Sequence, residues 1–156
     1  MLNPARRWAL RELKIHPGHT VVVAGAQAVW TVELVRELVT NTGSVIVIED
    51  NAQLAAEIAR RTARRGWTNV NVRADATRDE PLARADRAFF DNPGLVAEPS
   101  PLDRILRPLG PAARVAAVCT RGTRDRLIPT LERHVHVLRS EGFYLGAAFA
   151  LWGQLP

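Results

Sequence analysis

Residues Thr20–Asp50 read TVVVAGAQAVWTVELVRELVTNTGSVIVIED, and the fold class follows from this segment. Thr20–Ala24 and Ser44–Ile48 are short, β-branched apolar runs, which are typical of strands buried on both faces. Between them, Trp30–Val39 repeats valine at helical spacing, with charged residues in the intervening positions. Two buried strands joined by a helix predict a parallel β-α-β unit with a right-handed crossover. Such a unit binds ligands at the carboxyl ends of its strands.

The rest of the chain continues the alternation of strands and helices. A helix is expected before this segment, at Pro4–Ile15, and another after it, at Ala52–Arg65, with Asn51 as its N-cap. We expect further strands at Asn69–Arg73, Ala85–Phe90, Arg114–Val118 and Phe143–Trp152, and further helices at Leu102–Leu106 and Arg124–Ser140. This order predicts a single domain over residues 1–156, a doubly wound and mostly parallel α/β sheet. Because only one strand follows the last helix, we expect a shortened C-terminal end.

The composition is ordinary for a globular protein, with 47% hydrophobic and 24% charged residues. The single cysteine, Cys119, excludes an internal disulfide framework and fits a reducing compartment. The longest apolar run, Phe143–Trp152, is about half of what a membrane span requires, and no secretory leader opens the chain. We therefore expect a cytoplasmic protein with no membrane partner.

The net charge of +5 comes mainly from arginine, and such a positive charge favours a polyanionic partner. Arg60, Arg61, Arg64 and Arg65 fall on one predicted helix, opposite its apolar stripe. A solvated helix face is the favoured interpretation of these arginines, and an anion-binding patch is the alternative. Nucleic acid is therefore a possible partner, but not the favoured one.

Several segments resemble class I S-adenosylmethionine-dependent methyltransferases, and the resemblance covers about Ala5–Phe149. LKIHPGHTVVVAGAQAV lies where that superfamily has its first, glycine-rich motif, VIVIEDN resembles its second strand and NVRADA its third. ILRPLGPAARVAAV resembles the loop and fifth strand, and LRSEGF the end of the helix before the sixth strand. HTVVVAGAQAVWTVEL is most similar to the FkbM-like methyltransferases, and the precorrin methyltransferase group is a second relative. The resemblance implies the Rossmann-like methyltransferase fold.

The resemblance also implies S-adenosylmethionine as the cofactor. The residues that it assigns to cofactor binding are Ala24, Gly25, Ala26, Gln27, Glu49, Asp50, Asp75 and Ala76. Glu49 matches the acid that binds the ribose, and its chemistry agrees, since one carboxylate can accept both ribose hydroxyl protons. An acid here also occurs in NAD-binding Rossmann domains, but their G-x-G-x-x-G turn is absent.

The segment Asp91-Asn92-Pro93-Gly94 ends the expected fourth strand. Amino-methylating relatives place Asn/Asp-Pro-Pro-aromatic there, so the resemblance assigns Asp91 and Asn92 as catalytic residues, and a plain turn is the alternative. The chain departs from the superfamily pattern in its first motif. Val23 replaces an acid, and Gln27 and Val29 replace glycines.

The leading functional hypothesis is direct methyl transfer from S-adenosylmethionine to a small-molecule acceptor, without a metal. Two alternatives stay open: a member of the fold that binds a nucleoside or acts as a scaffold without catalysis, and a basic RNA-modifying module. An apolar terminal strand at a sheet edge needs a cover. We therefore also expect a possible homodimer.

Overall fold

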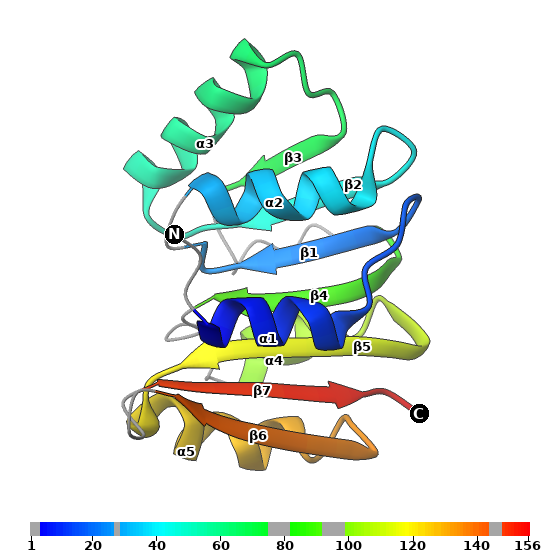
Figure 1. Cartoon of the computed structure of the whole chain (residues 1–156), viewed down its shortest axis with the longest axis vertical. Helices are drawn as coiled ribbons and strands as arrows, with labels where there is room; N and C mark the ends of the chain where they lie inside the picture. Colours follow the sequence, from blue (N-terminus) through cyan, green and yellow to red (C-terminus); the bar gives the residue numbers. More distant parts are fainter. Residues whose placement is uncertain (1–3, 27–28, 75–81, 92–98, 144–147) are drawn as a thin grey trace.

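The computed structural model describes residues 4–26, 29–74, 82–91, 99–143 and 148–156. Its strands form a single seven-stranded sheet with helices on both faces (Figure 1). The strands are β1 (Thr20–Ala24), β2 (Ser44–Ile48), β3 (Val70–Arg73), β4 (Ala85–Asp91), β5 (Leu109–Cys119), β6 (Val137–Phe143) and β7 (Ala148–Gln154). The helices are α1 (Pro4–Leu13), α2 (Val29–Val39), α3 (Ala52–Arg64), α4 (Pro99–Leu106) and α5 (Arg121–Leu131). None of these helices is long and apolar enough to cross a lipid bilayer.

The strand order is β3-β2-β1-β4-β5-β7-β6. Strands β1 to β5 are parallel to one another, whereas β7 is antiparallel to both β5 and β6. The order reverses between β1 and β4, which makes this the point where an open α/β sheet binds its ligands. In the register of the sheet, Ala24 at the end of β1 pairs with Ile48 of β2 and Phe90 of β4. The residues that follow these three positions therefore meet at one edge.

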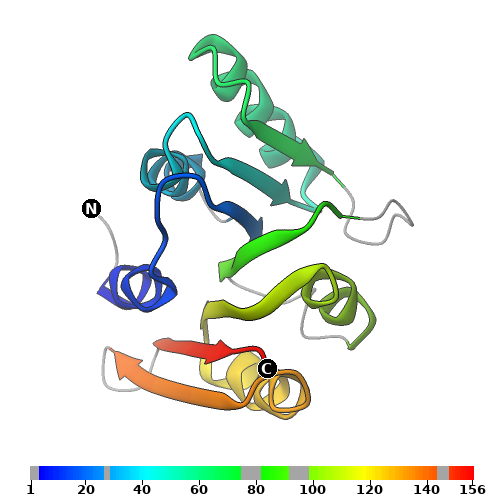
Figure 2. The ribbon, with the colours of Figure 1, turned by 90° about the vertical axis from the view of Figure 1, so that its right-hand side faces the viewer.

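The sheet buries a separate apolar core on each face. Alternate residues of β1, β2 and β4, such as Val21, Val45 and Phe89, pack with α1 and α2. The residues between them, such as Val22 and Phe90, face the opposite core, which contains side chains of α4 and α5. Figure 2 views the sheet from its side, with α1 and α2 to one side of it and α4 to the other. Because both faces are covered, the strands need apolar residues at every position.

The first half of the chain follows the sequence-based prediction closely. β1 and β2 have the predicted bounds, and α2 begins one residue before the predicted helix. The Asn51 side chain caps α3 as expected, since it accepts hydrogen bonds from the backbone nitrogens of Gln53 and Leu54. Gly66 follows α3 in the left-handed region, with φ of 65°. Local sequence signals therefore set these elements.

The C-terminal part differs from the prediction. Arg124–Ser140 was expected to be one helix, but α5 ends at Leu131 and Val137–Phe143 is strand β6. Phe143–Trp152 was expected to be one strand, but it is divided between β6 and β7. The prediction of one long helix was wrong because β6 pairs with β7 over seven residue pairs. This pairing stabilises the segment after Leu131 more than the helical spacing of the leucines in Arg124–Ser140 does. Two strands, β6 and β7, follow the last helix instead of one, so the prediction of a shortened C-terminal end was wrong.

The pairing of β7 also removes the stated reason for a homodimer. This strand lies between β5 and β6, and its apolar residues Phe149, Ala150 and Leu151 are buried. The strand at this edge of the sheet is β6, and it exposes Arg139 and Glu141. Charged residues on an edge strand discourage pairing with another chain. Dimerisation remains a prediction without this support.

The fifth strand is longer than predicted and begins with an irregularity. Arg114–Val118 was expected, whereas β5 starts at Leu109. The pairing with β4 shifts between Ala85, which pairs with Leu109, and Arg87, which pairs with Arg114. Ala112 adopts a positive φ of 60° inside this irregular stretch. The segment predicted as a loop is therefore a bulged start of the strand.

Helix α1 is fixed at its carboxyl end by two arginines of the sheet. Arg87 of β4 donates from Nε to the Leu13 carbonyl oxygen at 2.7 Å, and Arg114 of β5 donates from Nη1 to the Glu12 carbonyl oxygen at 2.9 Å. The last carbonyls of a helix have no partner within the helix, and cations are favourable there. These two hydrogen bonds therefore join α1 to the middle of the sheet.

Candidate functional site

The turn after β1 forms one part of the edge at the switch point. Gly25 has φ of 67°, in the left-handed region, and its backbone nitrogen donates to the Ile48 carbonyl oxygen at 2.9 Å. A residue with a Cβ is strained in this conformation, so glycine suits the position. Ala24 and Ala26 on either side are buried. These three predicted cofactor-binding residues lie together at the switch point.

The carboxylate of Glu49 lies at the end of β2, beside this turn. The residue is only 7% exposed, and its Oε1 accepts a hydrogen bond from the Asn51 backbone nitrogen at 2.8 Å. The Asp50 backbone also provides a hydrogen bond to this carboxylate. Burial raises the pKa of Glu49 above its ordinary value, and the nearby carboxylates of Asp50 and Asp91 raise it further. The site therefore holds a buried carboxylate at the end of β2, beside the Gly25 turn.

The neighbouring acid, Asp50, is half-buried and directly follows Glu49. The end of β3 reaches the same edge, because the Glu49 backbone nitrogen donates to the Arg73 carbonyl oxygen at 3.0 Å. Four predicted site residues lie outside the described residues: Gln27, Asp75, Ala76 and Asn92. Their assignment remains a prediction from the sequence.

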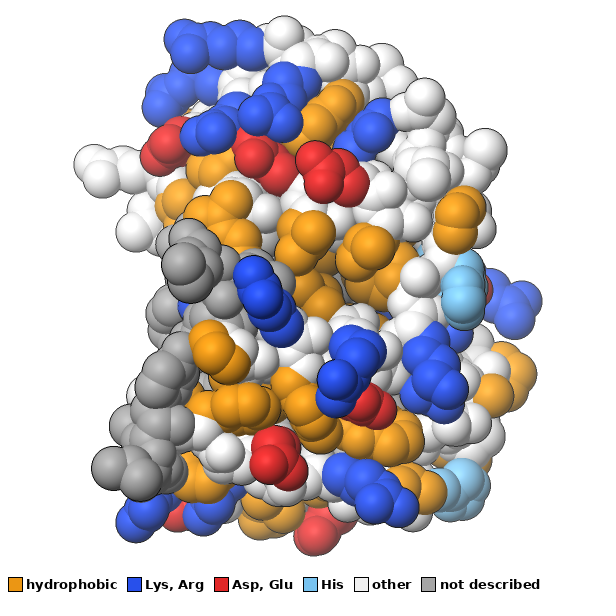
Figure 3. All heavy atoms as spheres, in the orientation of Figure 1, with side chains coloured by type: hydrophobic (Ala, Val, Ile, Leu, Met, Phe, Trp, Pro, Cys, Tyr) orange, Lys and Arg blue, Asp and Glu red, His pale blue; other side chains and the backbone are white. Residues whose placement is uncertain are grey.

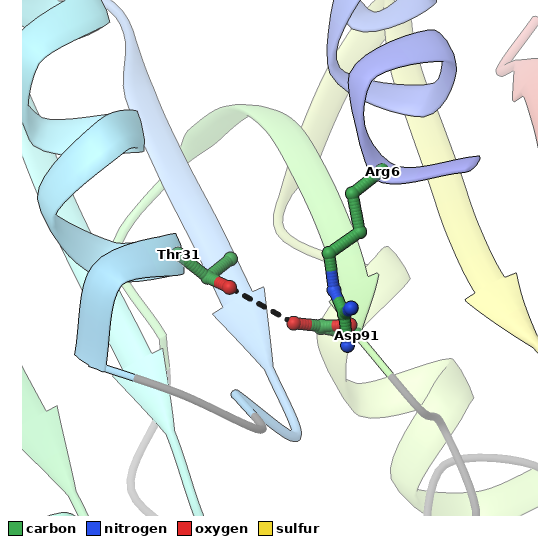
Figure 4. Close-up of polar contacts among 3 residues, drawn as sticks. All are labelled: Arg6, Thr31 and Asp91. Atoms are coloured by element: carbon green, nitrogen blue, oxygen red, sulfur yellow. Dashed lines mark hydrogen bonds and ion pairs between the residues drawn. The ribbon is translucent and has the colours of Figure 1, made fainter. Parts of the chain in front are cut away.

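Asp91, at the end of β4, is completely buried and joins two helices to the sheet (Figure 4). Its Oδ1 accepts a hydrogen bond from Nε of Arg6 in α1 at 2.8 Å. Its Oδ2 accepts one from Oγ1 of Thr31, in the first turn of α2, at 3.0 Å. Both carboxylate oxygens are thus held by protein groups. This arrangement makes Asp91 an internal anchor of the edge, and Asn92, the other predicted catalytic residue, follows it in the sequence.

Arg6 and Thr31 were not singled out in the sequence. Thr31 lies in the apolar face of α2 and is completely buried, and Arg6 is 13% exposed in its side chain. The guanidinium Cζ of Arg6 also lies 5.3 Å from the ring centroid of Trp30. No local pattern links residue 6 to residue 91, so only the fold brings them together.

Val29 and Val23 are two of the positions at which the chain departs from the pattern that it resembles. Val29 is 6% exposed and belongs to the core beneath α1 and α2. Val23, which replaces an acid, is completely buried in the same core. The apolar side chains at these two positions therefore pack in the core.

Cys119 ends β5 as a core residue. Its side chain is buried, and burial raises the pKa of the Cys119 thiol to about 11. A neutral, buried thiol is a poor nucleophile. Among the described residues, no group of three or more His, Cys, Asp or Glu side chains is arranged to hold a metal ion.

The arginines of α3 are partly engaged within the protein. Arg61 and Arg65 form ion pairs with Oε1 of Glu33 in α2, at 2.6 and 3.4 Å. The guanidinium groups of Arg65 and Arg36 both lie over the Trp67 ring, with Cζ 4.9 and 5.1 Å from its centroid. Half of the predicted basic face is therefore committed to contacts with α2 and with the end of α3.

No protein-family model and no curated protein sequence matches the chain. Solved structures of methyltransferases do match it. One is an S-adenosylmethionine-dependent O-methyltransferase from Thermotoga maritima, with a TM-score of 0.83 and 14% identity, over 99% of this chain and 66% of that one. A tRNA (m1A58) methyltransferase from Aquifex aeolicus has a TM-score of 0.78 and 14% identity, over 100% of this chain and 70% of that one. A precorrin-6y C5,15-methyltransferase from Geobacter metallireducens has a TM-score of 0.75 and 16% identity, over 97% of this chain and 86% of that one. At these identities the likeness establishes the fold, which is the predicted Rossmann-like methyltransferase fold.

Proposed function

We propose that the protein is an S-adenosylmethionine-dependent methyltransferase. The observation that carries the proposal is the buried carboxylate of Glu49 at the end of β2, beside the Gly25 turn and at the switch point of the sheet. A ligand at this edge meets a carboxylate on one side and a backbone without a Cβ on the other. The similarity of the fold to methyltransferases supports the same cofactor.

The residues present fit an adenosine-containing cofactor. Oε1 of Glu49 accepts a hydrogen bond from the Asn51 backbone nitrogen, and an ionised carboxylate has further acceptor positions that can take hydrogen bonds from the ribose hydroxyls. Burial makes such hydrogen bonds stronger than they would be in water, because the local dielectric constant is low. Gly25 and its alanine neighbours allow the backbone to approach the ligand closely. If Asp75 lies beside the adenine, as the resemblance implies, it completes the nucleoside contacts.

The role of the protein in the reaction is to hold the acceptor and the methyl group in the right relative position. S-adenosylmethionine supplies an electrophilic methyl group on a sulfonium, so direct transfer needs little acid–base chemistry. Asp91, held by Arg6 and Thr31, fixes the end of β4 and hence the start of the segment that contains Asn92. We assign Asn92 to the acceptor and Asp91 to the positioning of this segment. Proximity and orientation then account for most of the rate.

We further propose a small-molecule acceptor. The predicted basic face of α3 supports the RNA alternative less than the sequence indicated, because Glu33 already pairs with two of its four arginines, Arg61 and Arg65. Arg60 and Arg64 are left on this face, which weakens it as a phosphate-binding surface, since each neutralised phosphate adds only a modest electrostatic gain.

Calorimetric titration with S-adenosylmethionine and S-adenosylhomocysteine tests the proposal. We expect saturable binding of both compounds. Glu49→Gln should weaken binding by roughly tenfold to a hundredfold, because hydrogen bonds to a charged group contribute about 1.5–3 kcal/mol. Glu57→Gln, which changes an exposed glutamate of α3, is the matched control and should bind normally. Absence of binding by the folded wild-type protein would refute the methyltransferase proposal and favour a scaffold.

A further inference from the structure

A groove between α1 and α2 lies on the face opposite α4 and α5. It encloses about 290 Å³. Leu34 and Leu38 of α2 form one wall, one helical turn apart, and Leu10 and Ile15 contribute to its apolar lining. Leu38 is 37% exposed, one of two large hydrophobic side chains in the described residues that are exposed to this degree. Figure 3 shows hydrophobic side chains over this region of the surface.

The opposite wall of the α1–α2 groove is cationic. It consists of Arg7 and Arg11, one turn apart on α1, and Lys14, which directly follows the helix. All three are exposed, and no carboxylate lines the groove. Glu12 contacts Arg11 at 3.3 Å, which neutralises only one of the three charges. The groove therefore combines an apolar wall with a basic wall, and both walls run along the same direction.

We propose that the α1–α2 groove binds an acidic amphipathic helix of a partner protein. A groove between two neighbouring helices that run in the same direction (Figure 1) accepts a third helix along its length. Leucine-sized residues one turn apart on the partner would pack against Leu34 and Leu38. Asp or Glu residues along one flank of that helix would face Arg7, Arg11 and Lys14. The contacts lie away from the carboxyl edge of the sheet, so this proposal is independent of methyl transfer.

Two other occupants fit the surface less well. A second copy, docked about an axis that pairs α1 with α1, would bring two sets of the three cations together. A dimer that instead placed α2 against α1 would need acids on α2 to face the three cations. Of the two acids of α2, Glu33 is already paired with Arg61 and Arg65, so only Glu37 is left for this contact. A membrane surface needs protruding apolar side chains. Here Leu10 is buried and Ile15 and Leu34 are only half exposed, inside a concave surface.

The test uses a synthetic acidic amphipathic peptide with leucines at positions i, i+4, i+7 and i+11 and glutamates on one flank. Its scrambled sequence, which has the same charge, is the control peptide. Binding to the full chain is followed by fluorescence anisotropy and by two-dimensional NMR of the labelled protein. We expect saturable binding with chemical-shift changes confined to α1 and α2. Leu38→Glu should weaken it by roughly tenfold or more, and Arg11→Glu by roughly fivefold.

Two matched variants control for the change of charge itself. Val137→Glu alters the other exposed hydrophobic residue, on β6, and Arg60→Glu alters an exposed arginine of α3. Both should bind the peptide as the wild type does, and thermal unfolding should show all four variants folded. The proposal is overturned if the scrambled peptide binds equally well, or if the shifts fall elsewhere. It is also overturned if Leu38→Glu instead breaks a dimer in ultracentrifugation or abolishes binding to anionic vesicles.

Discussion

Replacing Asp91 by asparagine should destabilise the protein strongly, because the carboxylate is an internal anchor. The change keeps the size of the side chain and removes its charge. Arg6 would then keep a largely buried cation without this counter-charge, since its side chain is 13% exposed. Removing one member of a buried ion pair costs about 3–5 kcal/mol, and we expect about 3 kcal/mol because Arg6 retains some solvent.

For a chain of this length, each kcal/mol shifts Tm by about 2–4 °C, so Asp91→Asn should lower Tm by roughly 6–12 °C. Urea unfolding measures the free energy directly. The second contact has its own matched pair: Thr31→Ser keeps the hydroxyl donor, whereas Thr31→Val keeps the shape and removes it. Thr31→Val should cost about 1.5–3 kcal/mol, because the lost hydrogen bond is made to a charged acceptor, and Thr31→Ser should cost clearly less.

A purely catalytic carboxylate would behave differently. If Asp91→Asn left the free energy of unfolding within about 1 kcal/mol of wild type while abolishing methyl transfer, Asp91 would be a catalytic residue, as the resemblance assigned it, and the anchor interpretation would be wrong. A double-mutant cycle with Arg6→Met gives an independent check, because residues that share an interaction are not additive.

Three further measurements test other features of the structure. Burial raises the pKa of Glu49, so the folded protein binds the carboxyl proton more tightly than the unfolded chain and loses stability as the pH rises through that pKa. Glu49→Gln should therefore raise Tm of the ligand-free protein at neutral pH, and should have little effect on Tm below the pKa of a free glutamate. Since the pKa of the Cys119 thiol is about 11 and the side chain is buried, a disulfide reagent should react with it at mildly alkaline pH only after denaturant is added; rapid labelling of the native protein would contradict this. A Cβ on Gly153 would lie 2.8 Å from the Val137 carbonyl oxygen, so Gly153→Ala should cost about 1–3 kcal/mol in urea unfolding, and an unchanged midpoint would show that β6 and β7 are not packed as described.

The sequence predicted best where local signals and tertiary contacts agree. The β-branched runs of β1 and β2 can form little except buried strands, and Asn51 and Gly66 set the ends of α3 by their own backbone chemistry. At the C-terminus, the local sequence signals and the tertiary contacts favour different structures. Leu127, Leu131 and Leu138 keep a helical spacing, yet residues beyond Leu131 gain more from the ladder with β7.

The candidate site divides in the same way. Gly25 and Glu49 were predictable because they follow recognisable strands. The partners of Asp91 were not, since Arg6 is 85 residues away and nothing in its helix distinguishes it from Arg7. Only the packing of α1 over β4 and β5 gives Arg6 its role.

The attachment of α1 through Arg87 and Arg114 has a consequence for biosynthesis. The second of these hydrogen bonds joins residues 102 positions apart, so the end of the helix gains this contact from a side chain that is made much later. On the ribosome, the end of α1 has neither arginine until β4 and then β5 leave the exit tunnel. Helix α1 therefore gains both of these contacts only after β5 has been translated.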